Sequence, residues 1–266
     1  MNGAILALEN LTVRFGGLAA VDGVSFHVEP QTVHGLIGPN GAGKTTAFNL
    51  ISGLGHQNDG HILFNGETID DWPSWERAQR GLARTFQNIR TFGEMTVMEN
   101  VLAGMHAHVG GGLGATLLRL PSFRAAESAA IGKARDILGF VGLADASARR
   151  AGSLPYGDQR RLEIARALAS DPKLMLLDEP AAGMNPSETA SLIDLLLRLK
   201  ARGVTLLLVE HDMHFIMNLC DRITVLNFGR KIAESTPVEV RSDPSVIEAY
   251  LGTKVGERLE AGARVR

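Results

Sequence analysis

The segment Gly38-Pro39-Asn40-Gly41-Ala42-Gly43-Lys44-Thr45-Thr46 decides the fold because of what stands on either side of it. It follows an apolar run at 32–37 and opens a stretch with helical spacing that continues to about residue 54. Glycines let the backbone turn so that successive N–H groups face a phosphate, and the helix N-terminus adds a partial positive charge. Lys44 supplies a full charge to the β- and γ-phosphates, and Thr45 offers a hydroxyl to Mg²⁺. The segment therefore predicts a phosphate-binding loop, the P-loop.

Two other interpretations of this segment are weaker. A glycine-rich turn fits a chain with 30 glycines, but such a turn needs neither a strand before it nor a helix after it. A dinucleotide-binding fingerprint, G-x-G-x-x-G, fails because Thr46 occupies the position of its third glycine.

Short apolar runs at 32–37, 174–177, 205–209 and 223–226 alternate with longer helical patterns. Such runs are typical of strands buried on both faces, and their separation by helices predicts an α/β fold with a mainly parallel sheet. The segments 7–15 and 24–28 alternate more strongly and flank the pair Gly16-Gly17, which predicts an antiparallel β piece at the N-terminus. Between residues 95 and 169 only helical spacing appears, so a helical subdomain is inserted between strands. Its glycine-rich stretch at 108–120 is expected to be a mobile loop.

Two carboxylates, Asp178 and Glu179, end the apolar run that begins at Leu174. In an open parallel sheet the ligand lies beyond the carboxyl ends of the strands, so Asp178 is expected near Mg²⁺ and Glu179 near the attacking water. The alternative is that the pair caps the next helix, since Pro180 marks a turn.

Two further polar residues follow strand-like runs. His211 comes after the run 205–210 and is expected to reach a γ-phosphate, although a lone histidine here is more often an ordinary satisfied side chain. Gln87 ends the run at 82–86, where its neutral amide is expected to position water or Mg²⁺; ordinary surface polarity is the alternative.

Composition excludes several classes of function. The chain carries 27 basic and 29 acidic residues, so no global positive field draws it to nucleic acid, and nucleic acid is not expected as a partner. Its single cysteine, Cys220, cannot pair within the chain, which favours a reducing compartment. The apolar runs fall far short of the roughly 20 residues of a membrane span, and the N-terminus lacks a secretory signal. Membrane contact is therefore expected through a partner.

In this order the motifs resemble the ATP-binding cassette (ABC) family, from about residue 6 to residue 251. Gly38 to Thr45 is similar to its P-loop, Thr85-Phe86-Gln87 to its Q-loop, 174–179 to its magnesium strand with the catalytic glutamate, and Val209-Glu210-His211 to its switch histidine. The resemblance implies ATP and Mg²⁺ as cofactors, with Phe15 stacking on adenine; a packed strand residue is the alternative there. It also implies one ATPase domain over 5–253, with a core at about 5–92 and 170–253, a helical subdomain at about 93–169, and a tail at 254–266.

Leu154-Pro155-Tyr156-Gly157-Asp158 occupies the position of the family's L-S-G-G-Q signature. Pro155 replaces the serine whose hydroxyl meets the γ-phosphate, and Asp158 replaces the glutamine. Tyr156, Gly157 and Asp158 are still expected to bind nucleotide from a second subunit, because the following helix directs N–H groups at phosphate. Asn185 stands where many members have an aspartate.

The sequence around the motifs is similar to that of the longer ATPase subunit of bacterial branched-chain amino-acid importers. The similar segments are "RTFQNIRTFGEMTVMENV", "LPYGDQRRLEIARAL", "LDEPAAGMNPSET" and "VEHDM". This implies a chain bound peripherally to the cytoplasmic face of the inner membrane. Its implied partners are transmembrane permeases, a second ATPase subunit in a homo- or heterodimer and, indirectly, a periplasmic solute-binding protein. Importers of urea, amides or other amino acids, and lipid or lipopolysaccharide exporters, remain alternatives. A soluble cassette outside transport is disfavoured, because the chain has one set of motifs and no sustained heptad pattern.

Overall fold

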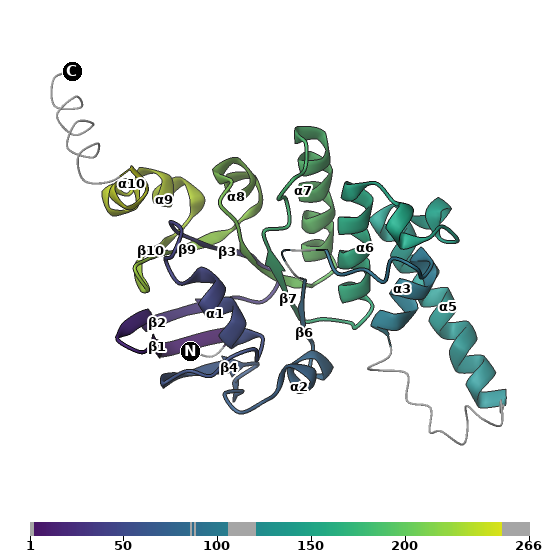
Figure 1. Cartoon of the computed structure of the whole chain (residues 1–266), viewed down its shortest axis with the longest axis horizontal. Helices are drawn as coiled ribbons and strands as arrows, with labels where there is room; N and C mark the ends of the chain where they lie inside the picture. Colours follow the sequence, from purple (N-terminus) through teal and green to yellow (C-terminus); the bar gives the residue numbers. More distant parts are fainter. Residues whose placement is uncertain (1–2, 86, 88, 106–120, 252–266) are drawn as a thin grey trace.

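The computed structural model describes residues 3–85, 87, 89–105 and 121–251. The central sheet has six strands, in the order β10-β9-β3-β8-β7-β6 (Figure 1). All neighbours run parallel except β10, which is antiparallel to β9. The strands are β3 (Val33–Ile37), β6 (Leu82–Arg84), β7 (Leu174–Asp178), β8 (Thr205–Val209), β9 (Arg222–Asn227) and β10 (Arg230–Ser235). The α/β class is therefore confirmed.

Alternate side chains of these strands enter two different cores. Met175 and Leu177 of β7 contribute to the core beneath the helices of one face, whereas Leu174 and Leu176 contribute to the core of the other face. Every residue of β3, β7 and β8 is buried. Burial on both faces explains why these strands are apolar runs without alternation in the sequence.

A second sheet of four antiparallel strands, in the order β2-β1-β4-β5, covers one of these cores. Its strands are β1 (Leu6–Phe15), β2 (Leu18–Val28), β4 (Asp59–Phe64) and β5 (Glu67–Thr68). The predicted antiparallel piece is present as the β1–β2 hairpin. The sequence reasoning did not identify β4 and β5.

Six helices belong to the α/β part of the chain. They are α1 (Lys44–Ile51), α2 (Ser74–Gln79), α7 (Pro186–Ala201), α8 (Met213–Leu219), α9 (Pro237–Ser242) and α10 (Pro244–Leu251). The P-loop helix α1 is shorter than predicted, because Gly53 adopts φ 74° and turns the chain after Ser52.

Between β6 and β7 the described residues form helices and turns without a strand, as predicted. These elements are α3 (Val97–Gly104), α5 (Pro121–Val141), two 3₁₀ turns at Ala144–Ala146 and Ala151–Ser153, and α6 (Tyr156–Leu168). Figure 1 shows α3, α5 and α6 gathered at one end of the molecule, away from α9 and α10. The glycine-rich stretch 108–120 and the tail 254–266 lie outside the described residues. No helix in the described part of the chain has the length and apolar character to span a membrane.

Candidate functional site

The P-loop is wedged between strands of both sheets. A Cβ atom on Gly38 would lie 2.1 Å from the carbonyl oxygen of Leu226 in β9, and one on Gly43 would lie 2.4 Å from that of Ala20 in β2. Both glycines also have positive φ, 151° and 99°, which other residues rarely adopt. Sequence reasoning assigned these glycines to the turn, and the structure adds that only glycine fits the space.

Lys44 begins α1 and folds back over the loop. Its Nζ donates hydrogen bonds to the carbonyl oxygens of Gly38 and Pro39, at 2.6 and 2.9 Å. Burial lowers the pKa of Lys44, and the negative charge of Glu179 partly offsets this shift. The ammonium group is therefore already held at the mouth of the loop.

A pocket of about 290 Å³ opens over the loop and α1. It places Glu179 opposite the P-loop backbone, although the two lie far apart in the sequence. Its lining residues are Leu18, Ala19, Ala20, Asn40, Gly41, Ala42, Gly43, Lys44, Thr45, Thr46, Glu179 and Phe228. Phe15, the expected adenine contact, is exposed at the end of β1 and is not part of this lining, whereas Leu18 and Phe228 are.

Asp178 and Glu179 end β7 at the carboxyl edge of the sheet. The backbone of Glu179 has φ 45°, and its N–H donates to the carbonyl oxygen of Val209 in the next strand at 2.9 Å. Asp178 is almost fully buried, while the side chain of Glu179 is a quarter exposed. One carboxylate therefore lies in the protein interior and the other faces the pocket.

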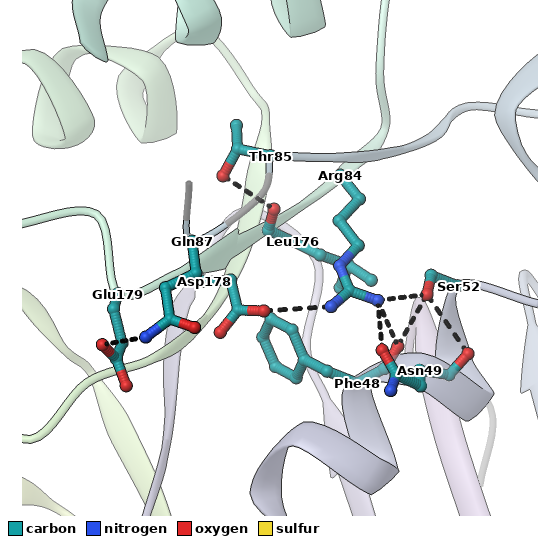
Figure 2. A network of polar contacts seen from close by, with 9 residues as sticks. All are labelled: Phe48, Asn49, Ser52, Arg84, Thr85, Gln87, Leu176, Asp178 and Glu179. Atoms are coloured by element: carbon teal, nitrogen blue, oxygen red, sulfur yellow. Dashed lines mark hydrogen bonds and ion pairs between the residues drawn. The ribbon is translucent and has the colours of Figure 1, made fainter. Parts of the chain in front are cut away.

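Gln87 and His211 both approach Glu179 (Figure 2 shows Gln87). Gln87 Nε2 donates to Glu179 Oε2 at 2.9 Å, and His211 Nδ1 lies 3.8 Å from Glu179 Oε1. The structure thus brings together Lys44, Gln87, Glu179 and His211 from four separate segments of the chain.

Glu210 is a residue that the sequence reasoning gave no role. Its side chain is buried and accepts hydrogen bonds from the backbone N–H groups of Ala181, at 2.9 Å, and His211, at 3.1 Å. Burial raises the pKa of this carboxyl, and the hydrogen bonds oppose that shift. Glu210 therefore joins the loop after Glu179 to the segment that carries His211. In the sequence, the position of Glu210 between an apolar strand and a histidine was the feature that could have indicated a role.

Arg84 is the second residue that the sequence reasoning missed. It ends β6, three residues before Gln87, and its guanidinium lies between β7 and α1 (Figure 2). Nη2 donates to Asp178 Oδ2 at 2.9 Å, and Nη1 donates to Asn49 Oδ1 and Ser52 Oγ at 2.9 and 2.6 Å. The end of β6 thus supplies a partner to each carboxylate, Arg84 to Asp178 and Gln87 to Glu179.

The signature residues lie away from the P-loop. The helix α6 begins at Tyr156, because Pro155 takes the N-cap position with extended backbone angles. Pro155, Gly157 and Asp158 line a separate pocket of about 260 Å³. Tyr156 Oη donates to the carbonyl oxygen of Ala182 at 2.9 Å, which ties α6 to the loop after Glu179. Within one chain, therefore, α6 does not complete the P-loop pocket.

Asn185 has a local role that its position after Glu179 did not reveal. Its Oδ1 accepts from the N–H of Glu188 at 3.0 Å, and Glu188 accepts from the N–H of Asn185 at 2.9 Å. This reciprocal pair is a capping box that starts α7. An asparagine performs this capping as well as an aspartate does.

The donor set fits a magnesium ion that is shared with a nucleotide. Thr45, Gln87 and Asp178 offer hydroxyl, amide and carboxylate oxygens, the ligands that Mg²⁺ prefers. Over the described residues, no group of three or more His, Cys, Asp or Glu side chains is placed to hold a metal. A few protein oxygens combined with substrate phosphates are the usual environment of Mg²⁺ in nucleotide-hydrolysing enzymes.

Comparison with known proteins adds independent findings. The family model "ABC transporter" matches residues 21–182, and the model "Branched-chain amino acid ATP-binding cassette transporter" matches 230–255. The chain is 46% identical over 253 residues to the high-affinity branched-chain amino acid transport ATP-binding protein LivG of Escherichia coli K12, covering 95% of this chain and 99% of LivG. It is 47% identical, with the same coverage, to the protein BraF of Pseudomonas aeruginosa, which carries the same description.

A solved structure shares the fold. The crystal structure of the ADP conformation of MJ1267, an ATP-binding cassette of an ABC transporter, superimposes with a TM-score of 0.81. It is 35% identical and covers 94% of this chain and 99% of its own.

Proposed function

This chain belongs to the ABC transporter family of ATPases, and from that premise we propose that it binds and hydrolyses ATP to power a bacterial importer of branched-chain amino acids. The observation that carries the proposal is the pocket in which the P-loop, Lys44 and Glu179 face one another. We treat 5–253 as one ATPase domain, with a core at about 5–92 and 170–253 and a helical subdomain at about 93–169.

In this proposal the P-loop holds the phosphates. The backbone N–H groups of 38–43 and the N-terminus of α1 face the β-phosphate, and Lys44 exchanges its two carbonyl contacts for phosphate oxygens. Thr45, Gln87 and Asp178 would hold Mg²⁺, which would neutralise part of the phosphate charge. Phe15, which pairs with the pocket residue Leu18 across the β1–β2 hairpin, remains the proposed adenine contact.

Hydrolysis rests on the residues around Glu179. Its carboxylate accepts the proton of the attacking water or orients that water toward the γ-phosphate. Gln87, 2.9 Å away, and His211, 3.8 Å away, hold the carboxylate in place and sense the γ-phosphate. Because phosphoryl transfer depends mainly on positioning, both neighbours contribute by fixing Glu179 and the water.

A second ATPase subunit completes the site. The N-terminus of α6, with Tyr156, Gly157 and Asp158, faces away from its own P-loop and is proposed to meet the nucleotide of the partner cassette. Pro155 contributes no side-chain cap, so the first N–H groups of α6 can turn to phosphate. The partner is a second copy of this chain or a companion ATPase.

ATPase subunits of ABC transporters work with transmembrane permeases, and a groove of this chain is proposed to receive one. The groove has a volume of about 550 Å³ and lies between the end of β6 and the helices α3 and α6. Arg84, Arg90, Phe92, Gly104 and Arg166 are among its lining residues. A short permease helix in this groove would contact the segment that also carries Gln87. The chain then sits on the cytoplasmic face of the inner membrane, and a periplasmic binding protein delivers the solute to the permease.

Two measurements test this proposal. Isothermal calorimetry and a phosphate-release assay with the purified chain should detect MgATP binding and hydrolysis. The substrate is tested in a strain that lacks the chain, where the wild-type gene should restore uptake of labelled leucine, isoleucine and valine. Restoration of urea, amide or lipid transport instead would reject the branched-chain assignment while leaving the ATPase assignment intact.

A further inference from the structure

The contact between Arg84 and Asp178 is a buried ion pair beside the nucleotide pocket. Both side chains are 9% exposed, and Nη2 lies 2.9 Å from Oδ2. A buried carboxylate requires a compensating charge, since burial of an isolated one costs several kcal/mol. Arg84 supplies this compensating charge to Asp178.

The guanidinium is itself fixed from the opposite side by α1. Nη1 donates to Asn49 Oδ1 at 2.9 Å and to Ser52 Oγ at 2.6 Å. The plane of the group lies near the ring of Phe48, whose centroid is 5.8 Å from Cζ. A planar group held by several partners cannot rotate freely, so it fixes the orientation of the carboxylate that it binds.

The contact uses only one of the two oxygens of Asp178. Figure 2 shows Oδ2 directed at Arg84 and the second carboxylate oxygen pointing away from it. A metal-binding carboxylate is usually oriented by a hydrogen bond to the oxygen that does not meet the metal. In the pair of Arg84 and Asp178, likewise, one carboxylate oxygen accepts the hydrogen bond and the other is left for a metal ion.

We propose that Arg84 is a positioning residue for Mg²⁺: it holds Oδ2 of Asp178 and thereby fixes the orientation in which the other oxygen meets the ion. The inference rests on the proposed function of Asp178 as the magnesium carboxylate. Arg84 and Ser52 also line the groove proposed for the permease, so an occupant of the groove contacts the same guanidinium.

A positive charge beside a metal site can also oppose metal binding, and magnitudes decide between the two effects. Loss of a partner that orients a metal ligand typically lowers metal affinity 10- to 100-fold. The repulsion between Arg84 and Mg²⁺ is always present, but the attraction of both cations to the carboxylate of Asp178 offsets it. Because Asp178 would remain as a buried and mobile carboxylate without Arg84, the loss of orientation is the larger effect.

The test is a magnesium titration of nucleotide binding by the full-length chain. Arg84→Gln should raise the Mg²⁺ concentration needed for half-maximal enhancement of ATP binding about 10-fold or more. Calorimetry in EDTA should give an affinity for metal-free ATP within about twofold of wild type, because the P-loop contacts are unchanged. Ser52→Ala, which removes one anchor of the guanidinium and leaves Asp178 untouched, should shift the Mg²⁺ midpoint in the same direction by a smaller factor.

Matched controls separate this role from a general effect on folding. Arg80→Gln removes an arginine four residues away that is half exposed and bound to Glu67, and it should leave the Mg²⁺ midpoint unchanged. Arg77→Gln removes a buried arginine whose partners are carbonyl oxygens of 50, 51, 69, 70 and 72, and it should lower the melting temperature without moving the midpoint.

Two outcomes overturn the inference. An unchanged midpoint in both Arg84→Gln and Ser52→Ala assigns Arg84 a purely structural role, and a lower midpoint shows that it competes with the ion. Asp178→Asn distinguishes this failure from failure of the proposed function. If Asp178→Asn also leaves the midpoint unchanged, then Asp178 does not bind Mg²⁺ and the assignment of the metal site is wrong.

Discussion

The P-loop and the segment before α6 both lead into the first turn of a helix, where backbone N–H groups have no partner within the helix, but their surroundings differ. The P-loop pocket holds a cation, Lys44, and is walled by β2, α1 and Glu179. The pocket beside α6 holds the acidic side chains of Asp158 and Glu188 together with Arg161. A phosphate therefore meets one cation and one carboxylate at the first surface, and two carboxylates with one cation at the second.

This difference is in line with the proposal that the P-loop binds nucleotide within one chain, whereas α6 meets the nucleotide of a partner cassette. The P-loop has the charge and enclosure to bind nucleotide alone. The N–H groups at the start of α6 are proposed to strengthen the binding of a phosphate that the P-loop of the partner cassette already holds. Substitutions on the P-loop side should therefore act in the isolated chain, and substitutions on the α6 side should act only when two cassettes meet.

The largest effect is expected for Glu179→Gln. A neutral isostere keeps the fold and the pocket but removes the base, so turnover should fall about 10²-fold or more in a phosphate-release assay. Binding of MgATP should survive, and uncleaved MgATP, unlike MgADP, should shift the chain toward dimer on gel filtration. The assembled transporter is the control, because isolated cassettes can pair weakly. Full ATPase activity in the variant would show that Glu179 is not the catalytic base, and Asp178 or His211 would then be the candidates for that role.

Lys44→Ala is expected to rank second. A hydrogen bond to a charged group contributes about 1.5–3 kcal/mol, so calorimetry should show ATP affinity lowered about 10- to 100-fold in the isolated chain. Turnover linked to transport should be lost. Unchanged binding would contradict the assignment of the P-loop and, with it, the contrast between the two surfaces.

A smaller effect is expected for Glu94→Lys, beside the groove. Glu94 is 92% exposed and pairs with Arg150 at 2.9 Å, away from the nucleotide pocket. Charge reversal should reduce transport several-fold more than basal hydrolysis, in line with a role in coupling. Arg150→Ala, which breaks the same ion pair without reversing the charge of Glu94, is the matched control. Equal losses of transport and hydrolysis would place this segment in the catalytic machinery.

The smallest effect is expected for Pro155→Ser. Backbone N–H groups supply the contacts of α6, so dimerisation driven by ATP should be unchanged or slightly stronger by light scattering. Binding of ATP by the single chain should not change at all, which sharpens the contrast with Lys44→Ala. Loss of hydrolysis in this variant would mean that Pro155 makes a contact that the structure of one chain does not contain.

Local patterns in the sequence were sufficient to predict the P-loop, the parallel strands and the inserted helices. Strands such as β7 and β8 are buried on both faces, and a buried strand is visible as an apolar run. The short strand β5 has two exposed residues and carries no such signal. It pairs with β4 across the short turn at Asn65 and Gly66, and two residues are too few to show the alternation of a strand.

The site shows the same division. Glycine spacing and carboxylates at a strand end were visible, so the meeting of Lys44 and Glu179 at one pocket could be predicted, with Asp178 at the end of β7. Arg84 was not, because a single arginine at the end of a short strand resembles any surface charge. Its meaning lies in Asn49 and Asp178, which are 35 and 94 residues away along the chain. Likewise, Glu210 became informative only when its contacts with the loop after Glu179 were known.

The backbone of Glu179, with φ 45°, has a consequence for protein engineering. A residue with a Cβ atom in the left-handed region costs roughly 1–2 kcal/mol relative to the usual conformation, whereas glycine occupies that region freely. A library screened for heat resistance alone should therefore enrich glycine at position 179 and collect stable chains that no longer turn over ATP. Selection for thermal tolerance and selection for growth would then diverge at this one codon.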